Sequence, residues 1–217
     1  MSFDVMLSQL GNGMLVSMLI YLVTVLGAVP LALPLAFARM SKNKLLRWLS
    51  AAYISVLRGT PLMLQLLVVF FGPWFLFRIR ISDGYRFYAV AIAFILNYAA
   101  YFAEIYRAGI EAIPVGQYEA AQVLRFSPAQ TFFRIVLPQV VKRILPPMTN
   151  EAITLIKDTS LAFAIGVMEM FTLAKQIASA EKSMLPLAAA AAFYYVFNLI
   201  VAAVLARAEK KLSYYRG

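Results

Sequence analysis

The sequence predicts an all-α fold: a polytopic membrane protein with five transmembrane helices and a cytoplasmic loop that carries two short helices. Composition is the first reason, because 63% of the 217 residues are hydrophobic, only 14% are charged and the mean hydropathy is +0.78. Soluble domains are nearer a quarter charged and a half apolar. The second reason is that the apolar residues form long runs, each near the about 20 residues that cross a bilayer. The length suits one membrane domain over residues 1–217 and leaves no room for a soluble one.

The charged and reactive residues exclude several classes of protein. A net charge of +10 suits either nucleic-acid binding or basic loops beside a membrane. The Lys and Arg residues lie next to apolar runs rather than along one helix face. This arrangement favours basic loops beside a membrane over nucleic-acid binding. The chain has no Cys and no His, which excludes disulfides, thiol chemistry, the usual zinc sites and imidazole proton relays. Asp4 and the lack of an early basic residue do not match a cleaved signal peptide.

The five predicted spans lie near residues 13–38, 51–77, 87–106, 144–171 and 184–206. An odd number of spans places the termini on opposite sides of the membrane, and Lys and Arg concentrate in cytoplasmic loops. Thirteen of them fall on the C-terminal side and five on the other. The thirteen are Arg39, Lys42, Lys44, Arg47, Arg107, Arg125, Arg134, Lys142, Arg143, Arg207, Lys210, Lys211 and Arg216; the five are Arg78, Arg80, Arg86, Lys175 and Lys182. We therefore expect the N-terminus outside and the C-terminus in the cytoplasm.

The first span and the residues before it leave two alternatives open each. Residues 1–12 have the spacing of a short amphipathic helix on the outer surface, or they are a frayed terminus. Pro30 and Pro34 predict a kink within the first span. The kinked helix either lines a pore or bends to pack against its neighbours.

The second span carries Arg58, Gly59, Thr60 and Pro61, which predict an unwound turn whose freed backbone groups need partners. An Arg inside the membrane is costly and should face protein, water or headgroups. Arg58 therefore has either a gating or structural role in the interior, or it snorkels to the cytoplasmic surface.

Asn97, Tyr101 and Glu104 recur at spacings of four and three in the third span, so they share one helix face. Asn97 and Glu104 are poorly suited to lipid, which predicts that this face is interior. Asn97 either contacts a solute or makes a structural hydrogen bond. Glu104, nearer the cytoplasm, suits a structural or gating role, and Tyr101 either contacts solute or fills an interhelical gap.

The fourth span is interrupted by Lys157, Asp158, Thr159 and Ser160. Adjacent helical residues point about 100° apart, so the two charges need not pair with each other. One interpretation is a structural ion pair with other helices. The other is a polar chamber at mid-membrane that contacts solute, because no other part of the sequence concentrates polar groups so far inside an apolar run.

Residues 117–138 form a polar loop between the third and fourth spans, with a predicted helix from Gln117 to about Leu124. Glu119 lies early in it, where the helix dipole favours an acid. Ser127 as N-cap, Pro128 at the first position and Gln130 three after the cap predict a second helix with a capping box. Leu137 and Pro138 are expected to end this helix, and Pro146 and Pro147 to begin the fourth span.

The spacing of the loop resembles the EAA loop of the permease subunits of type I ABC importers. The matching residues are Glu119-Ala120-Ala121, the position of Arg125, and Ile135-Val136-Leu137-Pro138. Residues Arg58–Pro61, Ala103–Ile110 and Ile156–Leu161 are similar to the polar amino-acid branch of that family. The likeness covers almost the whole chain. One residue departs from it, because the family usually has Gly where this chain has Arg125, and Gly there permits a left-handed turn.

The resemblance implies that the loop forms coupling helices that sit in a cleft of a partner ATPase. Its coupling residues are then Glu119, Ala120, Ala121, Arg125, Ile135, Leu137 and Pro138. It also implies two ATPase subunits, a second permease subunit that is identical or homologous, an extracytoplasmic solute-binding protein and a bacterial inner membrane. The chain has no GxxxxGK[ST] phosphate loop, so we expect ATP and Mg²⁺ on the partner, and no catalytic or metal-binding residue here.

The residues we expect to contact the solute are Asp158, Thr159, Ser160, Asn97 and Tyr101. A carboxylate such as that of Asp158 suits an α-ammonium group or a basic side chain, and hydroxyls suit an α-carboxylate. Arg58, Glu104 and Lys157 are the gating or structural polar residues. One alternative is a stand-alone secondary transporter or channel that uses Glu104 and Asp158, although no two-fold internal repeat is visible. Another is an ABC permease for a solute other than an amino acid.

Overall fold

The computed structural model describes residues 2–212, and these are helical with short connections. The elements in order are α1 (Phe3–Arg39), α2 (Lys44–Gly59), α3 (Leu62–Phe77), α4 (Tyr85–Glu111), α5 (Val115–Val123), α6 (Pro128–Thr131), a π-helical turn η1 (Phe132–Val136), α7 (Leu137–Asp158), a 3₁₀ helix η2 (Thr159–Ile165), α8 (Met170–Glu181) and α9 (Leu185–Leu212). The all-α prediction is confirmed. Arg216, used in the charge comparison, lies outside the described residues.

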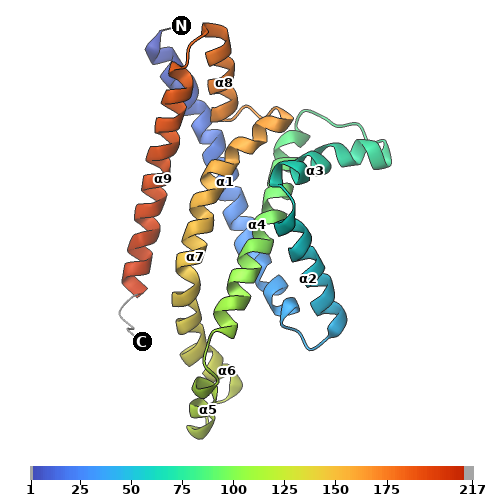
Figure 1. Ribbon diagram of the computed structural model, residues 1–217, viewed down its shortest axis with the longest axis vertical. Helices are drawn as coiled ribbons and strands as arrows, with labels where there is room; N and C mark the ends of the chain where they lie inside the picture. The colour runs from blue at the N-terminus through green and yellow to red at the C-terminus, as the bar shows by residue number, and fades with distance from the viewer. Residues whose placement is uncertain (1, 213–217) are drawn as a thin grey trace.

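Three of the described helices, α1, α4 and α9, are each long and apolar enough to cross a membrane. Two further candidates are pairs of helices that bend sharply: α2 with α3 at 108°, and the run from Pro128 to Ile165 with α8 at 59°. Counting each bent pair as one span gives five, in agreement with the sequence. Figure 1 shows the start of α1 and α8 at one end of the long axis, and α5 and α6 at the other; α9 runs from the first end toward the second.

Helix α1 runs without a break for 37 residues, so neither alternative for residues 1–12 is correct over the part described. Residues 3–12 are the outer turns of the same helix. At 1.5 Å per residue α1 is about 55 Å long, well beyond the about 30 Å hydrocarbon core of a bilayer. Met6 and Leu10 hold its first turns in place, because both are buried in a cluster with Met170, Ala174 and Ile177 of α8. Pro30 and Pro34 lie within the helix and do not end it.

The second predicted span is two helices, and α2 starts seven residues earlier than expected, at Lys44. Asn43 explains the early start, because its side chain accepts from the backbone N–H of Leu45 at 2.9 Å. The predicted unwound turn is present at Thr60 and Pro61. Pro61 has no N–H to offer the carbonyl of Leu57, and the side-chain amide of Gln65 donates to that carbonyl at 2.9 Å instead.

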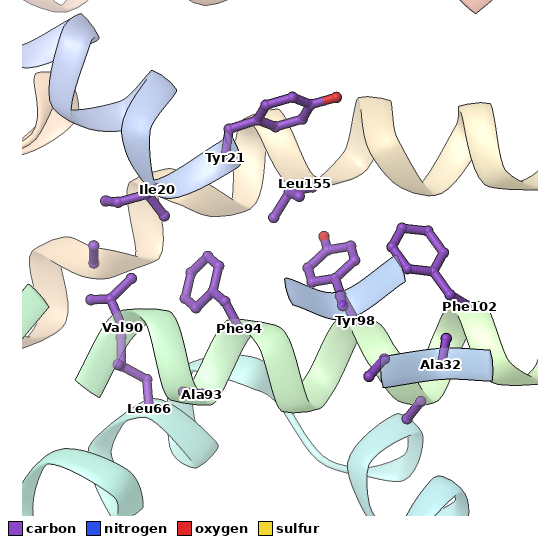
Figure 2. Close-up of a cluster of buried hydrophobic side chains, with 14 of the residues drawn as sticks. Ile20, Tyr21, Ala32, Leu66, Val90, Ala93, Phe94, Tyr98, Phe102 and Leu155 are labelled. Atoms are coloured by element: carbon purple, nitrogen blue, oxygen red, sulfur yellow. The ribbon is translucent and has the colours of Figure 1, made fainter. Parts of the chain in front are cut away.

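The core lies along α4, which packs mainly against α1. Ala28, Ala32 and Ala36 are completely buried, and their spacing of four places them on one face of α1. These small side chains allow the two helices to approach closely. Figure 2 shows Phe94, Tyr98 and Phe102 projecting from one side of α4 toward α1 and toward Leu155 of α7. Leu66 of α3 comes up on the other side of α4.

The prolines of the loop and of the fourth span do not act as the sequence suggested. Leu137 and Pro138 do not end a helix: they begin α7, which continues from α6 through the π-helical turn, where the N–H of Leu137 bonds to the carbonyl of Phe132. Pro138 is tolerated because it occupies the first turn of α7. Pro146 and Pro147 lie inside α7 rather than at its start. The helix then tightens at Thr159 and ends at Gly166, which has a φ of 73°.

A buried carboxylate that the sequence did not reveal joins three helices near the N-terminal end of α1. Glu169 is 0% exposed and caps the N-terminus of α8. It accepts from the N–H groups of Phe171 at 2.8 Å and Thr172 at 2.7 Å. The hydroxyls of Ser17 in α1, at 3.3 Å, and of Tyr194 in α9, at 3.1 Å, also donate to it. These donors reach both oxygens of the carboxylate.

Close packing of α1 on α8 supports this cluster. A Cβ atom on Gly13 would lie 2.7 Å from the Cα of Met170, the residue after Glu169. Backbone atoms cannot yield as a flexible side chain can, so this position requires glycine. The close approach brings Ser17, one turn further along α1, to the carboxylate.

Replacing Glu169 should therefore destabilise the protein. Glu169→Ala leaves several buried donors without an acceptor and should lower the free energy of unfolding by on the order of 3 kcal/mol. The apparent Tm in detergent should fall by about 10 °C. The Tm of Glu169→Gln should fall less, because the carbonyl oxygen of Gln still accepts hydrogen bonds. The exposed Asp4→Ala is the control, and a Tm unchanged in Glu169→Ala would contradict the role of this carboxylate.

Candidate functional site

A series of polar side chains follows the facing sides of α4 and α7 and continues to the end of α2. We call it the polar track. Its members are Asp158, Tyr98, Tyr101, Arg58, Glu151 and Glu104.

At the upper end of the polar track, the hydroxyl of Tyr98 donates to Oδ2 of Asp158 at 2.7 Å. Tyr98 is 2% exposed and Asp158 is half-buried. Asp158 is the last residue of α7, where the helix tightens. The bond fixes one carboxylate oxygen and leaves the other free of any hydrogen bond within residues 2–212. The sequence does not reveal this bond, because Tyr98 and Asp158 are 60 residues apart in the chain.

The other residues of the predicted mid-membrane set differ in accessibility. Thr159 is buried and its hydroxyl donates to the carbonyl of Ile156 at 2.8 Å. Ser160 is half-buried and donates to the carbonyl of Lys157 at 2.7 Å. Lys157 is exposed, and among the residues that the structure describes it forms no ion pair with Asp158 or with another helix. The interpretation as a structural ion pair therefore has no support within this subunit.

Asn97 is buried and has a structural partner on each of its two amide hydrogens. Nδ2 donates to the carbonyl of Leu57 and to Oε1 of Gln65, both at 2.9 Å. The carbonyl of Leu57 is the one that Pro61 leaves without a helical donor. Of the two roles left open by the sequence, the geometry favours the structural one: Asn97 ties the bend between α2 and α3 to α4.

Beside Tyr101, a cavity of ≈ 440 Å³ lies between α2, α4 and α7. Its polar lining includes three residues that the sequence singled out, Arg58, Tyr101 and Glu104, and two that it did not, Arg143 and Glu151. The guanidinium of Arg58 lies 5.1 Å from the ring centroid of Tyr101, a cation–π distance. The cavity thus presents both cationic and anionic groups.

Arg58 does not have the position that would let it snorkel from the start of a span. Because α2 begins at Lys44, Arg58 lies in its last turn, about 21 Å along the helix from Lys44 at 1.5 Å per residue. Its side chain faces the cavity and Tyr101. Within the subunit Arg58 is exposed, and its interior role stays a prediction.

Glu104 is paired near the C-terminal end of α4. It accepts from Arg107, whose Nε lies at 3.1 Å, and Arg107 also pairs with Glu111 one turn further on. Arg143 of α7 donates to the carbonyl of Ala112 at 2.7 Å, where α4 ends. These contacts join the ends of α4 and α7 at the entrance to the loop and agree with a structural role for Glu104.

Glu151 is the residue of the polar track that the sequence could have shown. It lies seven residues before Asp158 in α7, a spacing of two helical turns that places both carboxylates on one face. Considered alone, Glu151 follows Thr149 and Asn150 in a polar stretch and has the pattern of a helix end. The signal in the sequence was the second carboxylate seven residues from Asp158.

The loop between α4 and α7 has the two short helices that the sequence predicts. The capping box at Ser127 is complete: Ser127 Oγ accepts from the N–H of Gln130 at 3.2 Å, and Gln130 Oε1 accepts from the N–H of Ser127 at 2.9 Å. Helix α5 begins at Val115, two residues before the expected start, because Pro114 is a suitable residue to precede it. Both helices lie at the end of the long axis opposite α8 in Figure 1.

Arg125 occupies the left-handed conformation that Gly provides in the resembling family. Its φ is 56°. Its N–H bonds to the carbonyl of Gln122 at 2.9 Å, and the N–H of Phe126 bonds to that of Ala121 at 3.0 Å. These two bonds make a Schellman motif at the end of α5. The geometry of the turn is preserved although the glycine is not.

The loop has an apolar underside and an apolar outer surface. Ile113, Val136 and Val140 are buried together and attach the loop to α4 and α7. On the outside, four large apolar side chains are exposed: Val115, Val123, Leu124 and Phe133. Of the predicted coupling residues, Glu119, Ala120, Arg125 and Pro138 are exposed, Ile135 and Leu137 are half-buried and Ala121 is buried.

Comparison with known proteins agrees with this architecture. Residues 28–214 match the family described as binding-protein-dependent transport system inner membrane component. The chain is 38% identical over 187 residues to the L-cystine transport system permease protein TcyB of Bacillus subtilis, covering 85% of this chain and 78% of that protein. It is 36% identical over 203 residues to the putative glutamine transport system permease protein GlnP of Rickettsia bellii, covering 93% and 91%.

A solved structure resembles the chain along nearly its whole length. A chain in the crystal structure of an amino acid ABC transporter with histidines superimposes with a TM-score of 0.86 and 32% identity, covering 97% of this chain and 99% of that one. An all-helical membrane domain of this form defines the class: the transmembrane component of an ABC importer.

The chain belongs to the family of inner membrane components of binding-protein-dependent transport systems. It is a multi-pass permease subunit, and ATP hydrolysis lies in a partner subunit. A system of this kind includes an ATPase and a solute-binding protein. The alternative of a stand-alone secondary transporter or channel is therefore wrong.

Because Arg125 pays a steric cost at positive φ, replacing it with glycine should stabilise the loop. Arg125→Gly should raise the free energy of unfolding by about 1 kcal/mol, which raises the Tm by about 3 °C. Arg134→Gly in the right-handed π-helical turn is the matched control and should lower the Tm. A Tm lowered by Arg125→Gly would show that the Arg125 side chain contributes more than the strain costs.

Proposed function

We propose that this chain is the membrane permease of an ATP-driven importer for a polar amino acid, and that the solute moves along the polar track. The observation that carries the proposal is the mixed charge of the track, with Arg58 and two carboxylates, Glu151 and Asp158, on facing helices. A zwitterion needs both signs of charge where it is held in a low dielectric. The relatives named for L-cystine and glutamine support the same class of solute.

Each predicted residue takes a role that fits its contacts. Asp158 meets the α-ammonium or a basic side chain through its free oxygen, and Ser160 offers a hydroxyl beside it. Tyr101 lines the passage beside Arg58. Arg58 binds the carboxylate of the solute and gates the cavity. Thr159 and Asn97, whose donors are used inside the subunit, hold the site rather than contact the solute.

The depth of Asp158 supports a chamber near the middle of the membrane. The hydroxyl of Thr149 in α7 donates to Glu209 of α9 at 2.7 Å. Glu209 lies between Arg207 and Lys210, a charged stretch suited to the membrane surface. Asp158 is nine residues beyond Thr149, or about 13 Å along the helix, which is nearly half of a hydrocarbon core of about 30 Å.

The orientation proposed places the loop and the C-terminus in the cytoplasm and the N-terminus and α8 outside. The basic residues at the end of α9, the turn between α1 and α2 and the loop lie toward one end in Figure 1. The assembly proposed has two permeases, identical or homologous, and two ATPases that hold ATP and Mg²⁺. The solute-binding protein delivers the solute from outside.

The coupling role of the loop rests on its exposed surface and on its attachment to the bundle. Val115, Val123, Leu124 and Phe133 present apolar area that a protein cleft would cover, and Glu119 and Ala120 lie between them on α5. The capped helices and the cluster around Val136 make the loop rigid relative to α4 and α7. Movement of a docked ATPase would then tilt these helices and change access to the polar track.

Removing the negative charge at Asp158 tests the solute role. In proteoliposomes with the ATPase and the binding protein, Asp158→Asn should lower uptake and solute-stimulated ATP hydrolysis by about tenfold or more, because the amide cannot compensate an ammonium group. Asp83→Asn, exposed in the turn before α4, is the matched control. Uptake and stimulation equal to wild type in Asp158→Asn would remove this residue from the solute path.

Reversing the charge of Glu119 tests the coupling role. Glu119→Lys should insert normally but lose the ATPase from the purified complex, with uptake falling at least about tenfold, because the exposed carboxylate is placed for contact. The control for charge reversal is Asp4→Lys, in the first turn of α1 and far from α5. ATP-dependent uptake at the normal rate in Glu119→Lys would refute docking through α5.

A further inference from the structure

A strongly basic corner connects α1 and α2. We define the α1–α2 corner as residues 39–49, which include Arg39, Lys42, Lys44 and Arg47. There is no Asp or Glu in the sequence from residue 5 to residue 82. The four cations therefore have no acidic neighbour along the chain, in contrast to Arg107, which lies between Glu104 and Glu111.

Three of the four cations also have no acid paired with them in space, whereas Arg39 lies within electrostatic reach of Glu104. Lys42, Lys44 and Arg47 are exposed, and within residues 2–212 none of them is in an ion pair. The buried residues of α2 are Ser50 and Ile54. The first turn and a half of the helix, ahead of Ser50, is uncovered on every side.

The same turns carry large apolar side chains in a particular arrangement. Leu45 is 63% exposed and Trp48 is 65% exposed, and Leu46 and Leu49 are exposed as well. At about 100° per residue, Lys44 and Arg47 occupy one side of the helix and the three leucines the opposite side. Trp48 lies at the boundary between them. This is the pattern of a helix that lies at an interface between headgroups and acyl chains.

We propose that the α1–α2 corner binds anionic phospholipids, with Lys42, Lys44 and Arg47 on the headgroups and Leu45, Leu49 and Trp48 among the upper acyl chains. Charge complementarity selects the anionic lipid, because uncompensated Lys and Arg beside a membrane attract negative headgroups. The assignment to the inner leaflet rests on the orientation given under the proposed function. The corner lies apart from α5 and α6 in Figure 1, so this surface is separate from the one that meets the ATPase.

The lipid contact would bear on the polar track through α2. The corner is one end of this helix, and Arg58 is in the last turn at the other end. A headgroup that holds the corner at the membrane surface sets the depth of α2, and therefore the depth at which Arg58 meets Tyr101.

Trp48 provides a direct probe. The sequence has two tryptophans, so Trp74→Phe leaves Trp48 as the reporter in the full permease. This protein is reconstituted in phosphatidylcholine vesicles that contain an equal fraction of either brominated phosphatidylglycerol or brominated phosphatidylcholine. Quenching of Trp48 fluorescence should be about threefold stronger with the anionic lipid, and the preference should decline at ~0.5 M salt.

Charge removal supplies the matched comparison. Lys42→Gln, Lys44→Gln and Arg47→Gln together should make the two brominated lipids equally effective. The control removes three cations from the opposite end, Arg78→Gln, Arg80→Gln and Lys175→Gln, and should retain the preference. Equal quenching in the unaltered corner, or a preference that survives charge removal there, would overturn the proposal. Failure of both lipids to quench Trp48 would also overturn it, since a second copy or another protein would then cover the corner.

The outcome is independent of the importer proposal. No solute, ATP or ATPase is present, and both leaflets carry the same lipid, so neither the solute nor the orientation affects the quenching. Failure of the importer proposal would be seen in the uptake experiments and would leave the lipid preference unchanged.

Discussion

The buried carboxylate of Glu169 constrains the half of the molecule that contains α8 and the start of α1. A carboxylate in a low-dielectric interior needs donors, and these donors come from α1, α8 and α9. The close approach at Gly13 restricts how α8 packs against α1. Because α8 is held in this way, the short 3₁₀ helix before it lies between two packed helices. Asp158 directly precedes that 3₁₀ helix, so its position depends on a residue that lies outside the polar track.

Helix α4 packs into the core with one side and lines the cavity with another. Phe94 and Phe102 pack toward α1 and α7 in the core (Figure 2), whereas Tyr101 and Glu104 line the cavity. Asn97 connects these tasks by tying the bend after α2 to α4. Leu57, whose carbonyl Asn97 binds, directly precedes Arg58, so this amide holds the backbone next to the cation of the polar track.

Local chemistry was predictable from the sequence and tertiary chemistry was not. The capping box at Ser127, the unwound turn at Pro61 and the apolar spans follow from residues within a few positions of one another. The role of Glu169 does not, because its partners Ser17 and Tyr194 are far away in the chain. Tyr98 was missed for the same reason. Pro138 misled because a proline marks either the end or the first turn of a helix, and the preceding π-helical turn decides between them.

The π-helical turn sets how α7 is rotated about its axis relative to the loop helix α6. A π turn holds one residue more than an α turn, and each residue rotates a helix by about 100°. Since the backbone is helical from Pro128 to Ile165, the turn determines which way every side chain of α7 points relative to α6. Without the extra residue, the side chains of Glu151 and Asp158 would be rotated by about 100° relative to α6. The rotational alignment of the loop with α7 is thus encoded in the five residues between Thr131 and Leu137.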